Sequence, residues 1–136
     1  MSAATATQKS AIQNPQRSPL FASLIGVVAV IVLFQAVWAG IFIRESKKYN
    51  ATWVQVHSRG ADLAILLTIV AAIVIFIKIR ERRDLLIGSI TLAVALVLES
   101  YIGGLVGNSP WVTAIHFPLA MAIMGLCVWL PLRTRH

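Results

Sequence analysis

Four long apolar stretches, separated by short polar segments, form the hydropathy pattern of this chain. They cover residues 19–43, 52–79, 85–106 and 110–130. Each is long enough for an α-helix to cross a hydrocarbon layer of about 30 Å at about 1.5 Å per residue. The pattern therefore predicts an all-α fold with four transmembrane helices. This domain spans residues 18–132, and the polar residues 1–17 before it predict a disordered tail.

Capping and helix-breaking residues mark the ends of these stretches. Ser18–Pro19 and Ser109–Pro110 each place a capping serine before a proline in the first helical turn. Gly107–Asn108 follows the third stretch, and Pro131 follows the fourth. These signals predict the start of the first helix, the end of the third and both ends of the fourth.

The composition indicates an integral membrane protein, because hydrophobic residues make up 58% of the 136 residues and charged residues only 12%. A net charge of +7 would favour nucleic acid as the partner of a soluble protein. Here the basic residues flank the apolar stretches and indicate topology. We therefore expect a lipid bilayer, and no nucleic acid, as a partner. The single cysteine, Cys127, excludes an intrachain disulfide.

The distribution of lysine and arginine predicts the orientation in the membrane. Four spans put both termini on the same side as the turn between the second and third stretches. That side carries eight basic residues: Lys9, Arg17, Lys78, Arg80, Arg82, Arg83, Arg133 and Arg135. The other side carries four: Arg44, Lys47, Lys48 and Arg59. We therefore expect both termini in the cytoplasm, in the plasma membrane of a bacterium or archaeon.

The two halves of the chain resemble each other. The first stretch ends FQAVWAGIFI and the third ends LESYIGGLVG. Gln35 then matches Glu99, and the small pair Ala39–Gly40 matches Gly103–Gly104. Each half continues with a short loop, a tryptophan and a histidine. This repeat predicts an up-down four-helix bundle whose two helical hairpins are related by a pseudo-two-fold axis.

Two histidines, His57 and His116, lie inside the apolar stretches, where an ionisable side chain marks a functional site by default. In the predicted bundle their helices are diagonal, with axes roughly 12 to 14 Å apart. Both residues lie roughly 8 to 10 Å into their helices. This separation suits two axial ligands on opposite faces of one iron macrocycle. Alternatively, each histidine only hydrogen-bonds a neighbouring helix.

A haem fits this pair better than a bare metal ion, which would need three or four ligands. Gly40, Gly103 and Gly104 offer space for the faces of a porphyrin, and Arg59 is the candidate partner of its propionates. We therefore predict haem b (protoporphyrin IX iron) as the cofactor, with the two histidines as its metal ligands.

Two acidic residues also lie within the apolar stretches. Asp62 follows Arg59 by three residues, and this spacing predicts a salt bridge. Glu99 has no evident partner in the sequence, so it is either protonated in a polar pocket or part of a proton path. We assign no catalytic residue, and Glu99 is the candidate for a proton relay.

At these residues the chain resembles a half-length relative of the haem A synthase family, whose full-length members contain two four-helix repeats. The resemblance rests on VQVHSRGADLAIL and LESYIGGLVGNSPWVTAIHFPLAMAIMGL, and covers about residues 20 to 130. It implies that His57 and His116 are axial ligands of a b-type haem near the outer surface. The chain departs from active members at Val54, where they carry a glutamate, and in having no cysteine pair in an outer loop.

Three hypotheses follow for the function. The first is a small b-type membrane cytochrome that transfers single electrons or senses redox state or haem, with a membrane redox partner or a second copy of itself. The second is a haem-modifying enzyme that acts as a homodimer. Because Val54 replaces the glutamate, we favour a protein that is not an enzyme. The third is a haem-free accessory subunit of a membrane complex.

Overall fold

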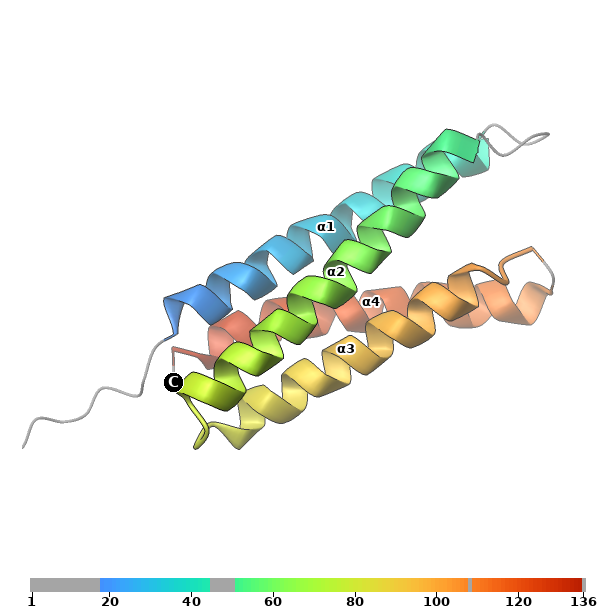
Figure 1. Ribbon diagram of the computed structural model, residues 1–136. Coiled ribbons are helices and arrows are strands. Elements are labelled where there is room, and N and C mark those ends of the chain that lie inside the picture. Colours follow the sequence, from blue (N-terminus) through green and yellow to red (C-terminus); the bar gives the residue numbers. More distant parts are fainter. Residues whose placement is uncertain (1–17, 45–50, 108, 136) are drawn as a thin grey trace, which may run out of the picture.

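The computed structural model consists of four α-helices that lie side by side (Figure 1). They are α1 (Pro19–Arg44), α2 (Ala51–Lys78), α3 (Arg83–Gly103) and α4 (Pro110–Arg133). The structure describes residues 18–44, 51–107 and 109–135, and within these ranges it contains no strand. The predicted tail of residues 1–17, residues 45–50 of the first loop, and Asn108 lie outside the described residues. The all-α, four-helix prediction is confirmed.

All four helices are long and apolar enough to cross a membrane. Their outward faces carry large apolar side chains, such as Leu66, Ile87 and Val128, which are 57%, 63% and 53% exposed. Apolar faces of this extent are unfavourable in water and favourable in lipid. In a bilayer, the helical hydrogen bonds also satisfy the backbone polar groups internally. The structure is therefore consistent with the predicted multi-pass membrane protein.

The predicted helix caps are present. The hydroxyl of Ser18 accepts a hydrogen bond from the backbone amide of Phe21 at 3.3 Å, and that of Ser109 accepts one from Trp111 at 3.3 Å. Each serine thereby satisfies an amide of the first turn that has no partner within the helix. The caps fix the first helical residues as Pro19 and Pro110.

Other boundaries differ from those predicted. The helix α3 begins at Arg83 and ends at Gly103, whereas the sequence pattern predicts residues 85–106. The carboxylate of Asp84 lies in the first turn of α3, where it interacts favourably with the helix dipole. The helix α4 continues through Pro131 to Arg133, because a proline near the end of a helix removes only one hydrogen-bond donor.

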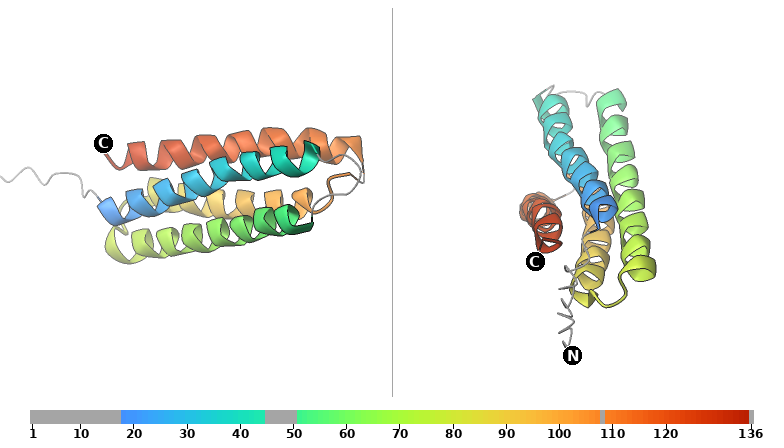
Figure 2. Two further views of the ribbon diagram at one scale, coloured as in Figure 1. Left: turned by 90° about the horizontal axis from the view of Figure 1, so that it is seen from above. Right: turned by 90° about the vertical axis from the view of Figure 1, so that its left-hand side faces the viewer.

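The helices form a ring in which α1 and α3 each pack against both α2 and α4. Figure 1 shows that α1 and α3 finish, and α2 and α4 begin, at one end of the molecule, which we call the loop end. The start of α1 and the finish of α4 lie at the opposite end, which we call the terminal end. There the C-terminal residues lie beside the start of α1 (Figure 2). In this ring α2 and α4 are diagonal to each other.

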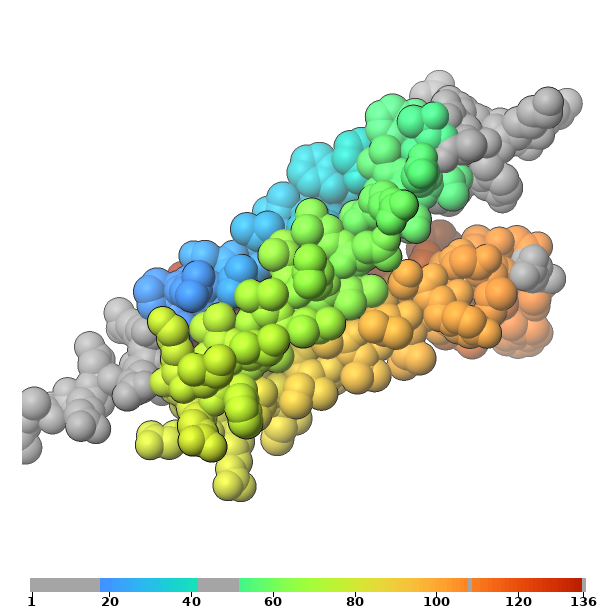
Figure 3. All heavy atoms as spheres, viewed as in Figure 1, coloured from blue at the N-terminus to red at the C-terminus, as the bar shows by residue number. Residues whose placement is uncertain are grey.

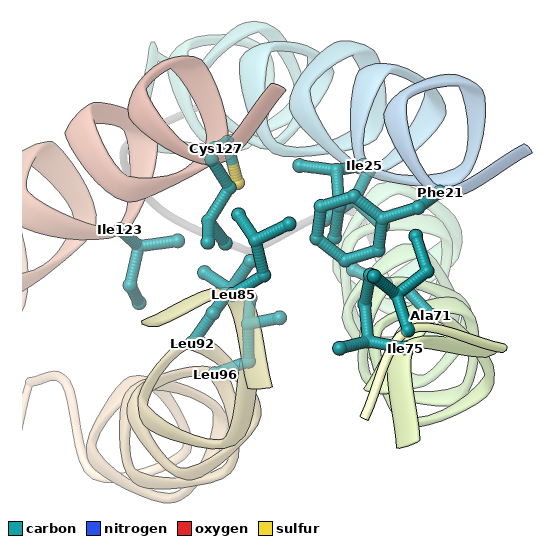
Figure 4. Packing of buried hydrophobic residues seen from close by; sticks show 13 residues of the cluster. Phe21, Ile25, Ala71, Ile75, Leu85, Leu92, Leu96, Ile123 and Cys127 are labelled. Atoms are coloured by element: carbon teal, nitrogen blue, oxygen red, sulfur yellow. The ribbon is translucent and has the colours of Figure 1, made fainter. Parts of the chain in front are cut away.

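Buried apolar side chains fill the half of the bundle nearest the terminal end. They come from all four helices and point toward one another (Figure 4). The largest that are fully buried are Phe21, Ile25, Ile75, Leu85, Leu92, Ile123 and Leu130. Because the tightly packed core lies in this half, it holds the four helices together there.

A cluster of charges closes the terminal end. The guanidinium of Arg82 donates to both carboxylate oxygens of Asp84, at 3.0 and 3.1 Å, and to the backbone carbonyl of Arg133 at 2.8 Å. The side chain of Arg133 donates to Asp84 at 3.2 Å. The hydrogen bond to Asp84 raises the pKa of Arg82 above its ordinary value. These contacts tie the turn between α2 and α3 to the end of α4.

Candidate functional site

Each helix contributes one polar side chain to a single cavity in the other half of the bundle. Gln35 comes from α1, His57 from α2, Glu99 from α3 and His116 from α4. We call these four residues the polar quartet. The cavity has a volume of about 360 Å³, within the range of roughly 300 to 1,000 Å³ that is usual for small-molecule sites.

The remaining cavity wall is apolar. Its residues are Val32, Leu33, Ala36, Ala39, Ala61, Ala64, Leu96, Phe117, Ala120, Met121, Ile123 and Met124. Alanine is the commonest residue among them, and its small side chain leaves space between the helices that larger residues would fill. The cavity is thus an apolar chamber with four polar groups on its wall.

The ring of His57 is tied to α1. Its Nδ1 lies 3.2 Å from the backbone carbonyl oxygen of Gln35. A carbonyl can only accept a hydrogen bond, so Nδ1 donates, and in the neutral ring Nε2 then carries the lone pair. The side chain of Gln35 lies against α2, where a Cβ at position 60 would collide with Gln35 Nε2. Gly60 therefore permits the close approach of α1 and α2 at this level.

The ring of His116 is placed against α3. Its Nδ1 lies 3.0 Å from Oε1 of Glu99, and the two side chains are only 17% and 13% exposed. The two groups are not in line for a hydrogen bond, so among the described residues both atoms lack a hydrogen-bond partner. A Cβ on Gly103 would lie 3.1 Å from Cε1 of the ring. His116 is therefore the ionisable neighbour of Glu99 in the structure.

The polar quartet forms two pairs, and each pair belongs to one hairpin. His57 contacts α1 within the α1–α2 hairpin, and His116 contacts α3 within the α3–α4 hairpin. Because α2 and α4 are diagonal, the two histidines lie on opposite walls of the shared cavity. Figure 3 shows the surface hollowed between α2 and α3 toward the loop end. The arrangement can present one imidazole to each face of a flat ligand.

The glycines predicted to face a porphyrin differ in their surroundings. Gly103 lies against His116. A Cβ on Gly104 would contact only carbonyl oxygens of its own helix, and a Cβ on Gly40 would have no neighbour within 4 Å. None of the three glycines lines the cavity.

Arg59 also lies away from the cavity. Its guanidinium is 3.6 Å from the carboxylate of Asp62, which confirms the predicted salt bridge, and its side chain is 76% exposed. Two residues along a helix correspond to a turn of roughly 200°, so Arg59 and His57 point to opposite sides of α2. A role for Arg59 with haem propionates remains a prediction.

Chain spacing could have identified both pairs of the polar quartet. Glu99 and His116 lie nine and eight residues on either side of Asn108, and Gln35 and His57 are equally spaced about residue 46. In two antiparallel helices joined by a short loop, such residues lie at the same depth. The spacing does not reveal that His57 uses the backbone of Gln35, whereas His116 meets a side chain.

No three histidine, cysteine, aspartate or glutamate side chains are grouped closely enough to hold a metal ion by themselves in the described part of the chain. Comparisons of the chain with protein-family models, curated proteins and solved structures found no match. The resemblance to the haem A synthase family therefore remains a prediction. The function has to be argued from the cavity and its polar quartet.

Proposed function

We propose that this protein binds haem b in its membrane domain, with His57 and His116 as the two iron ligands. The observation that carries this proposal is the position of the histidines on opposite walls of one apolar cavity. Their Nδ1 atoms face groups of their own hairpins, at 3.2 and 3.0 Å. Such outer contacts orient a ligating imidazole and leave Nε2 for the metal. The apolar, alanine-rich wall suits the macrocycle.

Haem iron that cycles between its ferric and ferrous states would supply single-electron chemistry at this site. If His57 and His116 both held the iron, they would leave no open position on it for a substrate, which favours electron transfer, or redox or haem sensing, over catalysis. A membrane redox partner or a second copy of this chain is then the expected partner. Among the described residues, no lysine or arginine lines the cavity.

We further propose that the α1–α2 and α3–α4 hairpins form a pseudo-two-fold repeat in an up-down bundle. The alternating directions of the four helices in Figure 1 and the polar pair within each hairpin support this. The terminal end carries the basic residues Lys78, Arg80, Arg82, Arg83, Arg133 and Arg135. By the positive-inside rule, this cluster supports cytoplasmic termini in a bacterial or archaeal plasma membrane.

A second candidate is a haem-free accessory subunit of a membrane complex. The observation in its favour is that both histidines already contact a neighbouring helix. Polar contacts of this kind contribute to helix association in membranes. On this alternative, the cavity would be a packing gap rather than a ligand site.

Titration of the detergent-purified protein with haemin separates the two candidates. We expect saturation at about one haem per chain and a low-spin b-type reduced-minus-oxidised spectrum. His57→Ala and His116→Ala should each lose this spectrum, because each removes one axial ligand. Thr91→Ala, on the exposed face of α3, is the control. Unchanged spectra in both histidine variants would contradict the proposal, and the absence of haem uptake by the wild type would favour the accessory subunit.

A further inference from the structure

The exposed part of the cavity wall belongs to only two helices. Leu33, Phe117 and Met121 line the cavity and are 58%, 52% and 76% exposed, and Ala36 is exposed as well. These residues come from α1 and α4. The lining residues of α2 and α3 are buried or half-buried. The exposed lining residues therefore mark an opening between α1 and α4, on a side distinct from the hollow between α2 and α3 in Figure 3, and we call these four residues the mouth.

The mouth lies within the membrane-spanning segments. Leu33 and Ala36 are eight and five residues from the end of the span Pro19–Ile41, and Phe117 and Met121 are seven and eleven residues from the start of α4. At about 1.5 Å per residue, the mouth lies about 8 to 17 Å from the ends of these two spans. With a hydrocarbon core about 30 Å thick, this depth corresponds to lipid tails rather than to water.

The chemistry of the mouth matches this environment. All four of its side chains are apolar, and the polar quartet lies on the wall behind them. A water-soluble or highly charged ligand would have to cross hydrocarbon to reach this opening, which is unfavourable. A flat molecule that partitions into the bilayer, with a polar centre for the histidines, meets no such barrier.

We propose that the ligand enters the cavity laterally from the bilayer, by passing between α1 and α4 at Met121. The identity of the ligand as haem rests on the function proposed above. Met121 is the most exposed residue of the mouth, and its unbranched thioether side chain adopts many conformations. It yields to a passing ligand and then covers the opening.

The size of residue 121 should therefore control the rate of loading. The apo form of the full-length protein is reconstituted in phosphatidylcholine vesicles, haemin is added, and the Soret band is followed in a stopped-flow instrument. Met121→Trp should slow loading by about tenfold, equivalent to about 1.4 kcal/mol of added barrier. Met121→Ala should load at least as fast as the wild type. Val128→Trp is the matched control, because Val128 is a lipid-exposed residue of α4 outside the cavity.

Release of haem to apomyoglobin provides the second measurement. An obstacle on the path raises the barrier equally in both directions, so Met121→Trp should slow release by the same factor as loading. An unchanged loading rate in Met121→Trp would overturn the lateral path. Slower loading of Met121→Trp without slower release would also overturn the lateral path, because it would indicate weaker haem binding rather than a narrower path. If the wild type showed no Soret band of bound haem, the proposed function itself would be overturned. If the wild type and the variants all bound haem at equal rates, only the lateral path would be overturned.

Discussion

Glu99 provides the sharpest test of how the histidines are held. Its carboxylate lies 3.0 Å from Nδ1 of His116, whereas His57 is held by the backbone carbonyl of Gln35. Glu99→Ala therefore removes the contact to its histidine, and Gln35→Ala leaves the corresponding carbonyl in place. Glu99→Ala and Gln35→Ala should therefore differ in their effect on haem binding, although the two residues occupy matching positions in their hairpins.

The expected size of the effect follows from the geometry. Glu99 and His116 are largely shielded from solvent, at 13% and 17% exposure of their side chains. Loss of an outer contact to a ligating histidine typically costs about 10- to 100-fold in affinity, or about 1.4 to 2.8 kcal/mol. We expect a loss of this size for Glu99→Ala. Glu99→Gln should lose less, because its amide oxygen keeps a hydrogen-bond acceptor beside Nδ1.

The assay is equilibrium titration of each apo variant with haemin in detergent, followed by the Soret band, together with a redox titration of the bound haem. An ionised carboxylate beside a ligating imidazole favours the ferric state, so a higher midpoint potential in both Glu99 variants than in the wild type would indicate that Glu99 is ionised, and an unchanged potential that it is protonated. Thr91→Ala again serves as the control on the same helix. An affinity loss for Gln35→Ala that equals or exceeds that of Glu99→Ala would refute the reasoning.

Two further predictions concern the packed terminal half. A Cβ on Gly88 would lie 2.7 Å from Cδ2 of the buried Leu130, so Gly88→Ala should destabilise the protein by about 1 to 3 kcal/mol. Gly26→Ala, where a Cβ has no neighbour within 4 Å, should not, and thermal unfolding in detergent compares the two. Asp84→Asn weakens the contacts with both arginines and should cost about 0.5 to 1 kcal/mol, because these groups are partly exposed. In high salt, the same unfolding assay should show a smaller stability difference between Asp84→Asn and the wild type. An equal or larger difference would contradict an electrostatic origin.

The helices were predictable because a membrane leaves the backbone few alternatives. A span of this length must satisfy its hydrogen bonds internally, so apolar length alone predicts a helix. The capping pattern at Ser18 and Ser109 then determines where two helices begin. Pro131 was misleading as a stop signal, because a proline this close to the end of a helix removes only one hydrogen-bond donor, and the helix continues to Arg133.

The side of each helix that faces the interior of the bundle was much harder to predict. Each helix is apolar around most of its circumference, so no polar stripe indicates which side faces the protein. The polar quartet was recognisable because polar residues in a span usually face inward. The assignment of Arg59, Gly40, Gly103 and Gly104 to the cofactor depended on helix rotation, and none of the four lines the cavity in the structure. The exposed mouth at Met121 had no signal in the sequence, because methionine is common in apolar helices.

Electron paramagnetic resonance of the ferric haem complex tests the central claim most directly, namely that His57 and His116 hold one iron from opposite walls of the cavity. The account predicts a low-spin bis-imidazole signal in the wild type. It also predicts that His57→Ala and His116→Ala each convert this signal to high spin or abolish it. A low-spin signal that persists unchanged in either single variant, or a high-spin signal in the wild type, would contradict the account.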